Sequence, residues 1–143
     1  MRLVPTVVLD TSTLVSAALR PGSVPSVAFR QSLARFEVAT CDATLDELDR
    51  VLRRPKFNRY LPLDDRMQFV ELVRRYGRPF TVSTDHLTAS RSCPDPKDAV
   101  FLALALACSA RVLVSSDADL LGMHPFQGID VLTPAAFVQL LDG

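Results

Sequence analysis

The apolar run Ala99–Ala107 is the sequence feature that most constrains how this chain can fold. Every residue in it is apolar and most are strong helix formers, so the helix that it predicts has no polar face and must be surrounded by other elements. Pro96 suits the first helical position, which makes Asp95 the N-cap and Asp98 the third helical residue. The sequence therefore predicts a buried helix that begins beside two carboxylates.

Asp95 and Asp98 have two interpretations. They resemble a capping box with Asp in place of Glu, and carboxylates are favourable at a helix N-terminus in any protein. They can also belong to a catalytic or metal-binding group. The other acidic residues of the chain decide between these interpretations.

Short apolar segments alternate with helical patterns along the chain. The predicted strands are 4–9, 36–40, 80–83, 111–115 and 129–132, and the predicted helices follow Asp10, run from 23 or 25 to 35, from 42 to Pro55, over 63–76, over 96–107, after Asp117 and after Thr133-Pro134. Residues 56–62 are predicted as an irregular link, and 84–93 as a polar segment rich in turns. This alternation favours one domain with a parallel sheet covered by helices on both faces.

Ligands of such sheets bind beyond the carboxyl ends of the strands. Asp10 ends the first predicted strand, Asp117 follows a later one, and Asp98 opens a helix on the same edge. Glu47 lies on the flank of an apolar helical stripe, whereas Asp46 points away from it. The position of Glu47 therefore depends on how its helix packs.

Several carboxylates at one edge repel each other unless a cation offsets their charge. A set of oxygen ligands without His or Cys suits Mg²⁺ or Mn²⁺, as one or two ions, and two such ions can support in-line displacement at a phosphodiester. Each acid also has a structural interpretation, since Asp10 and Asp117 are good N-caps and Glu47 can be a solvated helix residue.

Four motifs occur in the order found in one known family. They are Val7-Val8-Leu9-Asp10-Thr11-Ser12, then Leu45-Asp46-Glu47-Leu48 with Val51-Leu52-Arg53-Arg54-Pro55-Lys56-Phe57, then Asp95-Pro96-Lys97-Asp98 before Phe101-Leu102-Ala103-Leu104-Ala105, and then Ser115-Ser116-Asp117-Ala118-Asp119-Leu120-Leu121. In these motifs the chain resembles the PIN domain, and more narrowly the VapC-like toxins of toxin-antitoxin pairs. Each motif alone is weak, but the four span nearly the whole chain.

The resemblance implies a PIN-like, Rossmann-like α/β fold with three α/β/α layers and a central parallel sheet of about five strands, as a single domain over residues 1–143. It implies an endoribonuclease that depends on Mg²⁺ or Mn²⁺, forms a homodimer and is inhibited by a cognate antitoxin. Because the family includes members without demonstrated activity, the alternative is a non-catalytic PIN-fold module that binds RNA or a protein partner.

The resemblance also implies roles for particular residues. The metal-binding and catalytic acids would be Asp10, Glu47, Asp98 and Asp117, with Asp95 and Asp119 auxiliary and Thr11 and Ser116 as polar neighbours that position water or phosphate. Ser115 stands where many relatives carry Thr, which leaves the acids intact.

A basic run follows Glu47 and consists of Arg50, Arg53, Arg54, Lys56 and Arg59. It can guide an RNA backbone toward the acids, and the interleaved Phe57 and Tyr60 offer a ring for stacking. The same residues can instead be a solvated face with core or interface aromatics, or a contact for the antitoxin. His86 and His124 are isolated and receive no catalytic role.

Composition excludes several other classes. The 16 basic and 16 acidic residues cancel, so the chain lacks the overall charge of a nucleic-acid coat protein. We expect no signal peptide in the first residues and no membrane span. Cys41, Cys93 and Cys108 have no metal-like spacing, which indicates free thiols in a reducing cytoplasm.

Two other enzyme or signalling classes place an Asp after the first strand. A haloacid-dehalogenase-like phosphatase would need a second Asp where this chain has Ser12. A receiver-type phosphoacceptor would need a late Lys, and there is none after Lys97. The sequence disfavours both.

Overall fold

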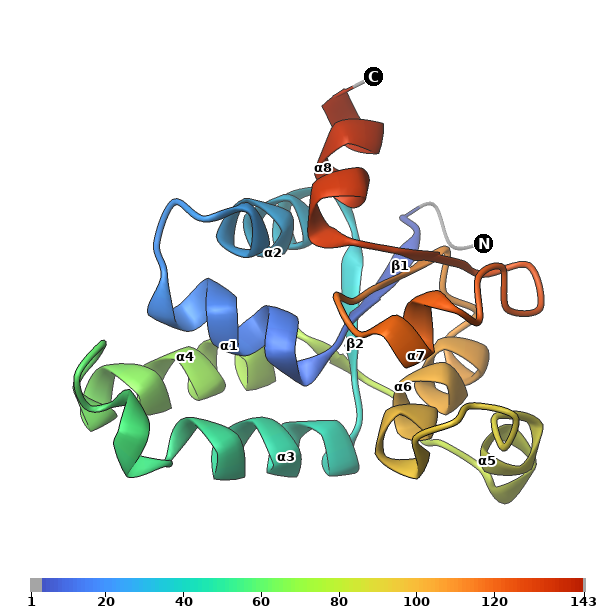
Figure 1. The fold of residues 1–143 in the computed structure, drawn as a ribbon, viewed down its shortest axis with the longest axis horizontal. Coiled ribbons are helices and arrows are strands. Elements are labelled where there is room, and N and C mark those ends of the chain that lie inside the picture. The colour runs from blue at the N-terminus through green and yellow to red at the C-terminus, as the bar shows by residue number, and fades with distance from the viewer. Residues whose placement is uncertain (1–3, 143) are drawn as a thin grey trace.

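Five short parallel strands form the sheet at the centre of the computed structural model, which describes residues 4–142 (Figure 1). The strands are β1 (Thr6–Leu9), β2 (Glu37–Thr40), β3 (Arg78–Pro79), β4 (Val112–Val114) and β5 (Asp130–Leu132). Their order is β3-β2-β1-β4-β5, and each neighbouring pair is parallel. The central strand β1 pairs Val7 with both Val38 and Val112. The predicted parallel sheet is therefore confirmed.

Eight α-helices and one 3-10 turn connect these strands within residues 4–142. The helices are α1 (Thr11–Leu19), α2 (Val24–Arg35), α3 (Asp42–Leu52), α4 (Leu63–Tyr76), α5 (Thr84–Ala89), α6 (Pro96–Ala107), α7 (Ala118–Leu121) and α8 (Pro134–Asp142), and the 3-10 turn η1 is Pro55–Phe57. Asp10, Asp95 and Asp117 are N-caps whose side chains accept backbone N–H groups, as their sequence positions predict.

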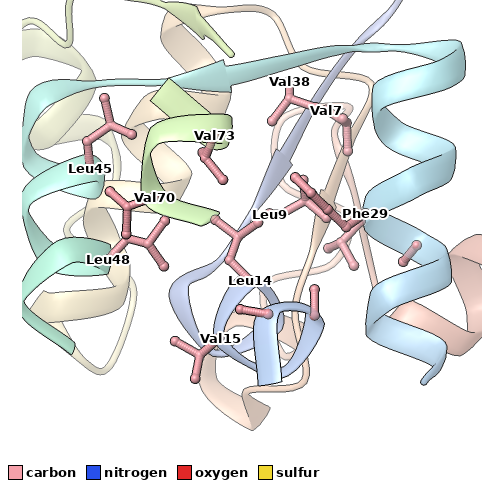
Figure 2. Close-up of a cluster of buried hydrophobic side chains, with 14 of the residues drawn as sticks. Val7, Leu9, Leu14, Val15, Phe29, Val38, Leu45, Leu48, Val70 and Val73 are labelled. Carbon is pink, nitrogen blue, oxygen red and sulfur yellow. The ribbon is translucent and has the colours of Figure 1, made fainter. Parts of the chain in front are cut away.

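The two faces of the sheet are covered by separate hydrophobic clusters. On one face Val7 and Leu9 pack with side chains of α1, α2, α3, α4 and α8, a cluster that Figure 2 shows around Leu14, Val70 and Val73. On the other face Val8, the residue between Val7 and Leu9 in β1, packs with side chains of α6 and α7. Alternate side chains of one strand thus enter different clusters, which is the geometry of three α/β/α layers.

The helix predicted from the apolar run lies in the second cluster. In α6, Leu102, Ala103 and Ala105 have no exposed surface. Helix α5, which the sequence analysis treats as part of a polar segment rich in turns, packs against α6. The prediction of turns over 84–89 is wrong because Ser83 starts a helix by accepting the N–H of His86 at 3.2 Å.

The strand predicted over 80–83 is also misplaced. The paired residues of this edge strand are Arg78 and Pro79, and the N–H of Phe80 continues the ladder by donating to the Thr40 carbonyl at 2.8 Å. The strand begins early because Gly77 ends α4 against β2, where a Cβ would lie 2.6 Å from the Thr40 Cγ2. Absence of a side chain at residue 77 thus lets the chain enter the sheet at once.

The link after α3 is more regular than predicted, since η1 occupies part of the segment described as irregular.

Cys41, Cys93 and Cys108 are buried free thiols, as expected. Within residues 4–142 no helix has the length and apolarity that crossing a bilayer requires. The signal-peptide prediction rests partly on residues 1–3, which lie outside the described residues.

Candidate metal centre

Carboxylates gather at the carboxyl edge of the sheet, where β1 and β4 end. Asp10 directly follows β1, and its N–H donates to the carbonyl of Val114, the last residue of β4, at 3.1 Å. Asp117 lies just beyond β4 and caps α7. Helix α6 begins beside α7 and carries Asp95 and Asp98 in its cap and first turn. The topology thus brings together acids that are far apart in the sequence, as predicted.

Asp10 is the most completely hydrogen-bonded acid of this edge. It is 4% exposed, and its Oδ1 accepts the N–H of Thr13 at 2.9 Å. Its Oδ2 accepts the hydroxyl of Ser115 at 2.5 Å, and Ser12 lies 3.3 Å from Oδ1. The helix-capping interpretation of Asp10 is therefore confirmed. Because a carboxylate oxygen has more than one lone pair, these bonds also leave acceptor capacity for a cation.

Ser115 connects two of the predicted site acids. Its side chain has no exposed surface, donates to Asp10 and accepts the N–H of Asp117 at 2.9 Å. The Asp117 Oδ1 in turn accepts the N–H of Asp119 at 2.8 Å. One buried hydroxyl thereby fixes the carboxylate after β1 relative to the backbone after β4. In the sequence Ser115 is visible only as a departure from Thr, because a serine at a strand end gives no signal of its partners.

Asp98 has the least satisfied carboxyl group of the edge. Its Oδ2 is buried and has no hydrogen-bond partner among the described residues. Ligand oxygens of Asp95, Asp98 and Asp119 lie within 4.8 Å of one another. The pKa of Asp98 is raised to about 7, first by burial, then by the negative charge of Asp117 and that of Asp95, with smaller effects of a hydrogen bond to Asp117 and the charge of Asp10.

The raised pKa of Asp98 means that its ionised form is unfavourable without a compensating charge. An unpaired buried oxygen surrounded by further carboxylates is a suitable ligand set for a hard divalent cation such as Mg²⁺ or Mn²⁺. The donor set contains no thiolate or imidazole that would favour a softer metal. The residues present therefore fit the metal that the sequence analysis expects.

Cys93 lies next to the carboxylates and was not singled out by the sequence analysis. Burial raises the pKa of its thiol, a backbone hydrogen bond from Asp95 opposes this, and the charges of Asp98, Asp119 and Asp95 raise it further. The thiol therefore stays protonated beside the acids. A lone buried cysteine has no sequence pattern that distinguishes this position from an ordinary core position.

Glu47 lies on α3, where it is half-buried next to the buried Leu48. It is neither in the group formed by Asp95, Asp98 and Asp119 nor among the carboxylates that raise the pKa of Asp98. Helix α3 contacts α6, so Glu47 is carried by an element that borders the site. The structure brings the other acids together more closely than it brings Glu47.

The two predicted polar neighbours have different environments. Thr11 is buried, its Oγ1 has no partner among the described residues, and it lines a small internal cavity with Leu45 and Phe101. Ser116 is exposed beside Asp117. Only Ser116 is open to a ligand from solvent.

The five basic residues after Glu47 are all exposed, and they extend from α3 into the turn that leads to α4 (Figure 1). Arg53 pairs with Asp49 at 2.5 Å. Lys56 lies over the ring of Phe57, which packs against the core, and Arg59 lies over the ring of Tyr60. The core interpretation of the aromatics thus fits Phe57, whereas Tyr60 is 51% exposed.

The two histidines have local structural contacts. The Nδ1 of His86 lies 2.9 Å from the Ser83 hydroxyl, and the Nδ1 of His124 accepts the N–H of Val131 at 2.9 Å. These contacts organise the start of α5 and the loop before β5. His86 is half-buried and His124 is exposed, and neither belongs to the carboxylate group formed by Asp95, Asp98 and Asp119.

Several solved structures share this fold. VapBC2 from Rickettsia felis, in a structure bound to a promoter DNA fragment, matches with a TM-score of 0.63 and 11% identity over 88% of this chain and 96% of that chain. PAE2754 from Pyrobaculum aerophilum matches with a TM-score of 0.64 and 16% identity over 98% and 91%. VapC20 from Mycobacterium tuberculosis, a toxin that cleaves the sarcin-ricin loop, matches with a TM-score of 0.59 and 15% identity over 87% and 98%.

No curated protein matches the chain by sequence. The family model described as PIN domain matches residues 6–119, which include β1, the basic run and all the carboxylates of the edge. The order of motifs, the parallel sheet and the carboxylates at its edge agree with this match. The chain belongs to the PIN domain family.

Proposed function

We propose that this protein is a metal-dependent endoribonuclease that hydrolyses RNA phosphodiester bonds. The observation that carries the proposal is the buried, unpaired Oδ2 of Asp98 among further carboxylates at the carboxyl edge of the sheet. Asp10, Asp98 and Asp117 would hold Mg²⁺ or Mn²⁺, with Asp95 and Asp119 auxiliary. Glu47 would complete the set from α3.

When bound, the metal supplies positive charge to phosphate oxygens and lowers the pKa of water in the site. The chain's own residues prepare this site. Ser115 holds the Asp10 carboxylate in one orientation through the 2.5 Å hydrogen bond, and Asp117 keeps one oxygen on the first turn of α7. Ser116, which is exposed at the rim, is available to donate a hydrogen bond to a phosphate oxygen.

Cleavage of a labelled structured RNA pool tests the proposal. We compare wild type with Asp98→Asn in Mg²⁺, in Mn²⁺ and in EDTA. We expect cleavage by wild type but not by Asp98→Asn, and only with metal. Asp46→Asn is the matched control, because Asp46 is exposed on α3 and outside the carboxylate group. Metal-dependent cleavage that survives in Asp98→Asn would refute the assignment.

Calorimetric titration with Mn²⁺ tests the metal site separately from catalysis. We expect a binding signal in wild type and Asp46→Asn that is lost in Asp98→Asn and Asp10→Asn. Binding that persists in both site variants would place the metal elsewhere. RNA target and cleavage position do not enter this measurement.

The second candidate is a non-catalytic module that binds RNA or a protein partner. It is favoured by one observation, namely that Asp10, Asp95 and Asp117 each cap a helix and so have a structural reason to be present. Folded protein without Mn²⁺ binding and without cleavage would support this candidate.

We also propose that the protein is the toxin of a toxin-antitoxin pair, acts in the cytoplasm, forms a homodimer and binds a cognate antitoxin. Support comes from the structures of FitAcB and of FitAB with an IR36 DNA fragment, which match with 20% and 18% identity, and from VapBC2. Growth arrest on expression, relieved by co-expression of a neighbouring small reading frame, is the expected result. Arrest that Asp98→Asn also causes would contradict it.

A further inference from the structure

Arg66 is a fully buried cation whose partners are all uncharged. Its side chain lies in α4 with no exposed surface and donates to the carbonyls of Leu52 at 2.5 Å, Arg54 at 3.0 Å and Leu61 at 3.0 Å. It also donates to the Asn58 side-chain oxygen. These acceptors surround one guanidinium, so the chain from the end of α3 to the start of α4 is held in a single conformation.

The segment fixed by Arg66 carries a concentration of exposed positive charge. No acidic residue occurs from Arg50 to Tyr60, although the whole chain has no net charge. We define the basic arc as Arg50, Arg54, Lys56 and Arg59, which are exposed and have no ion-pair partner among residues 4–142. Arg53 is left out because Asp49 neutralises it.

Helix α3 connects the carboxyl edge of the sheet, where it begins after β2, to the basic arc at its other end. Arg50 follows Glu47 by three residues within α3 and so lies on about the same side of that helix, whereas Arg54 lies two residues beyond the end of α3, in extended backbone before η1. Figure 1 shows α3 running from the carboxyl end of β2 to the turn before α4. A chain of phosphates can therefore pass from the site along α3 to the arc.

We propose that the basic arc binds the RNA backbone beside the cleavage site and that Arg66 is the positioning residue that holds the arc in place. This rests on the proposed function, because it takes RNA as the polyanion. Grouped cations over a buried cation repel one another, and a phosphate backbone offsets this charge without reading base sequence. The exposed ring of Tyr60 beside Arg59 offers a surface on which an unpaired base stacks.

Fluorescence anisotropy with labelled single-stranded RNA in EDTA tests the arc without any cleavage. We expect the Arg50→Ala/Arg54→Ala double variant to bind about tenfold more weakly and to reduce the slope of log affinity against log salt by about 1.4, since each phosphate contact contributes about 0.7. Arg53→Ala is the matched control and should change affinity less than twofold. Equal losses of RNA affinity in the double variant and in Arg53→Ala, or no loss of affinity in either, would overturn the proposal.

Arg66→Lys tests the positioning role while keeping the charge. We expect faster hydrogen exchange of amides 53–61, with the core strands unchanged, and a several-fold loss of RNA affinity. Unchanged affinity with faster exchange would refute positioning. Arg66→Gln, which keeps some donors, serves as the second variant if Arg66→Lys does not fold.

Binding and cleavage separate the arc from the nuclease proposal. Asp98→Asn should still bind RNA in EDTA, and if it binds but wild type never cleaves, the arc stands and the nuclease fails. If wild type cleaves with metal while the double variant binds and cleaves normally, the nuclease stands and the arc fails. Loss of binding to a purified antitoxin but not to RNA would make the arc a protein interface and overturn the proposal.

Discussion

Arg66 and Asp98 both carry buried polar atoms, and the surroundings of these atoms differ. Arg66 donates to three backbone carbonyls and one amide oxygen, so each nitrogen of its guanidinium is hydrogen-bonded by the chain itself. Asp98 has a buried oxygen without a hydrogen-bond partner in residues 4–142 and further carboxylates around it. The hydrogen bonds of Arg66 stabilise the fold, whereas the Asp98 carboxylate lacks a compensating positive charge. Arg66 is therefore a structural residue, and Asp98 belongs to a candidate ligand site.

The largest effect on stability should follow removal of the hydrogen-bonded Arg66 charge. Arg66→Met removes the guanidinium from the carbonyls of Leu52 and Leu61 and from the Asn58 side-chain oxygen, and each lost bond costs about 1 kcal/mol or more, whereas the Arg54 carbonyl keeps the N–H of Phe57 at 3.1 Å. We expect the free energy of unfolding to fall by about 3 kcal/mol, measured by urea denaturation. Replacement of the exposed Arg30 by Met is the control and should change it by less than about 0.5 kcal/mol. A loss below about 1 kcal/mol would show that the Arg66 contacts contribute little.

Removal of the Asp98 charge should instead lower the cleavage rate strongly without lowering stability. We expect Asp98→Asn to lower the cleavage rate at least about 100-fold, equal to about 2.7 kcal/mol of transition-state stabilisation. Without metal, the same variant should be as stable as wild type or more stable at pH 7, because a carboxylate with a raised pKa no longer has to ionise. Rate measurements and urea denaturation check both parts. A marked loss of stability would make Asp98 a structural residue like Arg66.

Ser115 should show an intermediate effect, because its hydroxyl serves both the fold and the site. Ser115→Ala removes the donor to Asp10 and the acceptor for the Asp117 N–H. We expect about 1 to 2 kcal/mol lower stability and about tenfold slower cleavage. Ser115→Thr keeps the hydroxyl and should restore both, which the same two assays check. Equal defects in Thr and Ala variants would mean that side-chain volume at residue 115, not the hydroxyl, is what matters.

The smallest predicted effect is the pH dependence of stability without metal. The pKa of Asp98 is about 7 in the folded protein, above its value of 3.8 in an unfolded chain. Between these values the folded state holds more protons than the unfolded state, so stability falls as pH rises from about 4 to about 7. We expect thermal melts in EDTA to show this fall in wild type. The fall should be smaller in Asp98→Asn and after addition of Mn²⁺, and equal slopes in all three samples would contradict the assignment.

Helix starts and the acids at strand ends could be predicted because they depend on local chemistry. Pro96 at the first turn and a capping Asp95 indicate the start of α6, and Leu63–Tyr76 is the helix that its pattern predicts. The errors are the position of the edge strand, the helix α5 in a segment predicted as turns, and the turn η1 in a link predicted as irregular. β3 has two residues, and its position depends on how closely Gly77 approaches β2, which no local pattern reports.

The alternation of strands and helices, the helix N-caps and the position of Asp10, Asp98 and Asp117 at one sheet edge can all be read from the sequence. Caps and periodicity act over a few residues, and the parallel topology follows from chain order. Tertiary structure alone decided that Ser115 reaches Asp10 and that one Asp98 oxygen stays unpaired. It also decided that Arg66 is buried among backbone carbonyls. These features depend on contacts between elements distant in the chain, and hydrogen-bond satisfaction is a property of that packing.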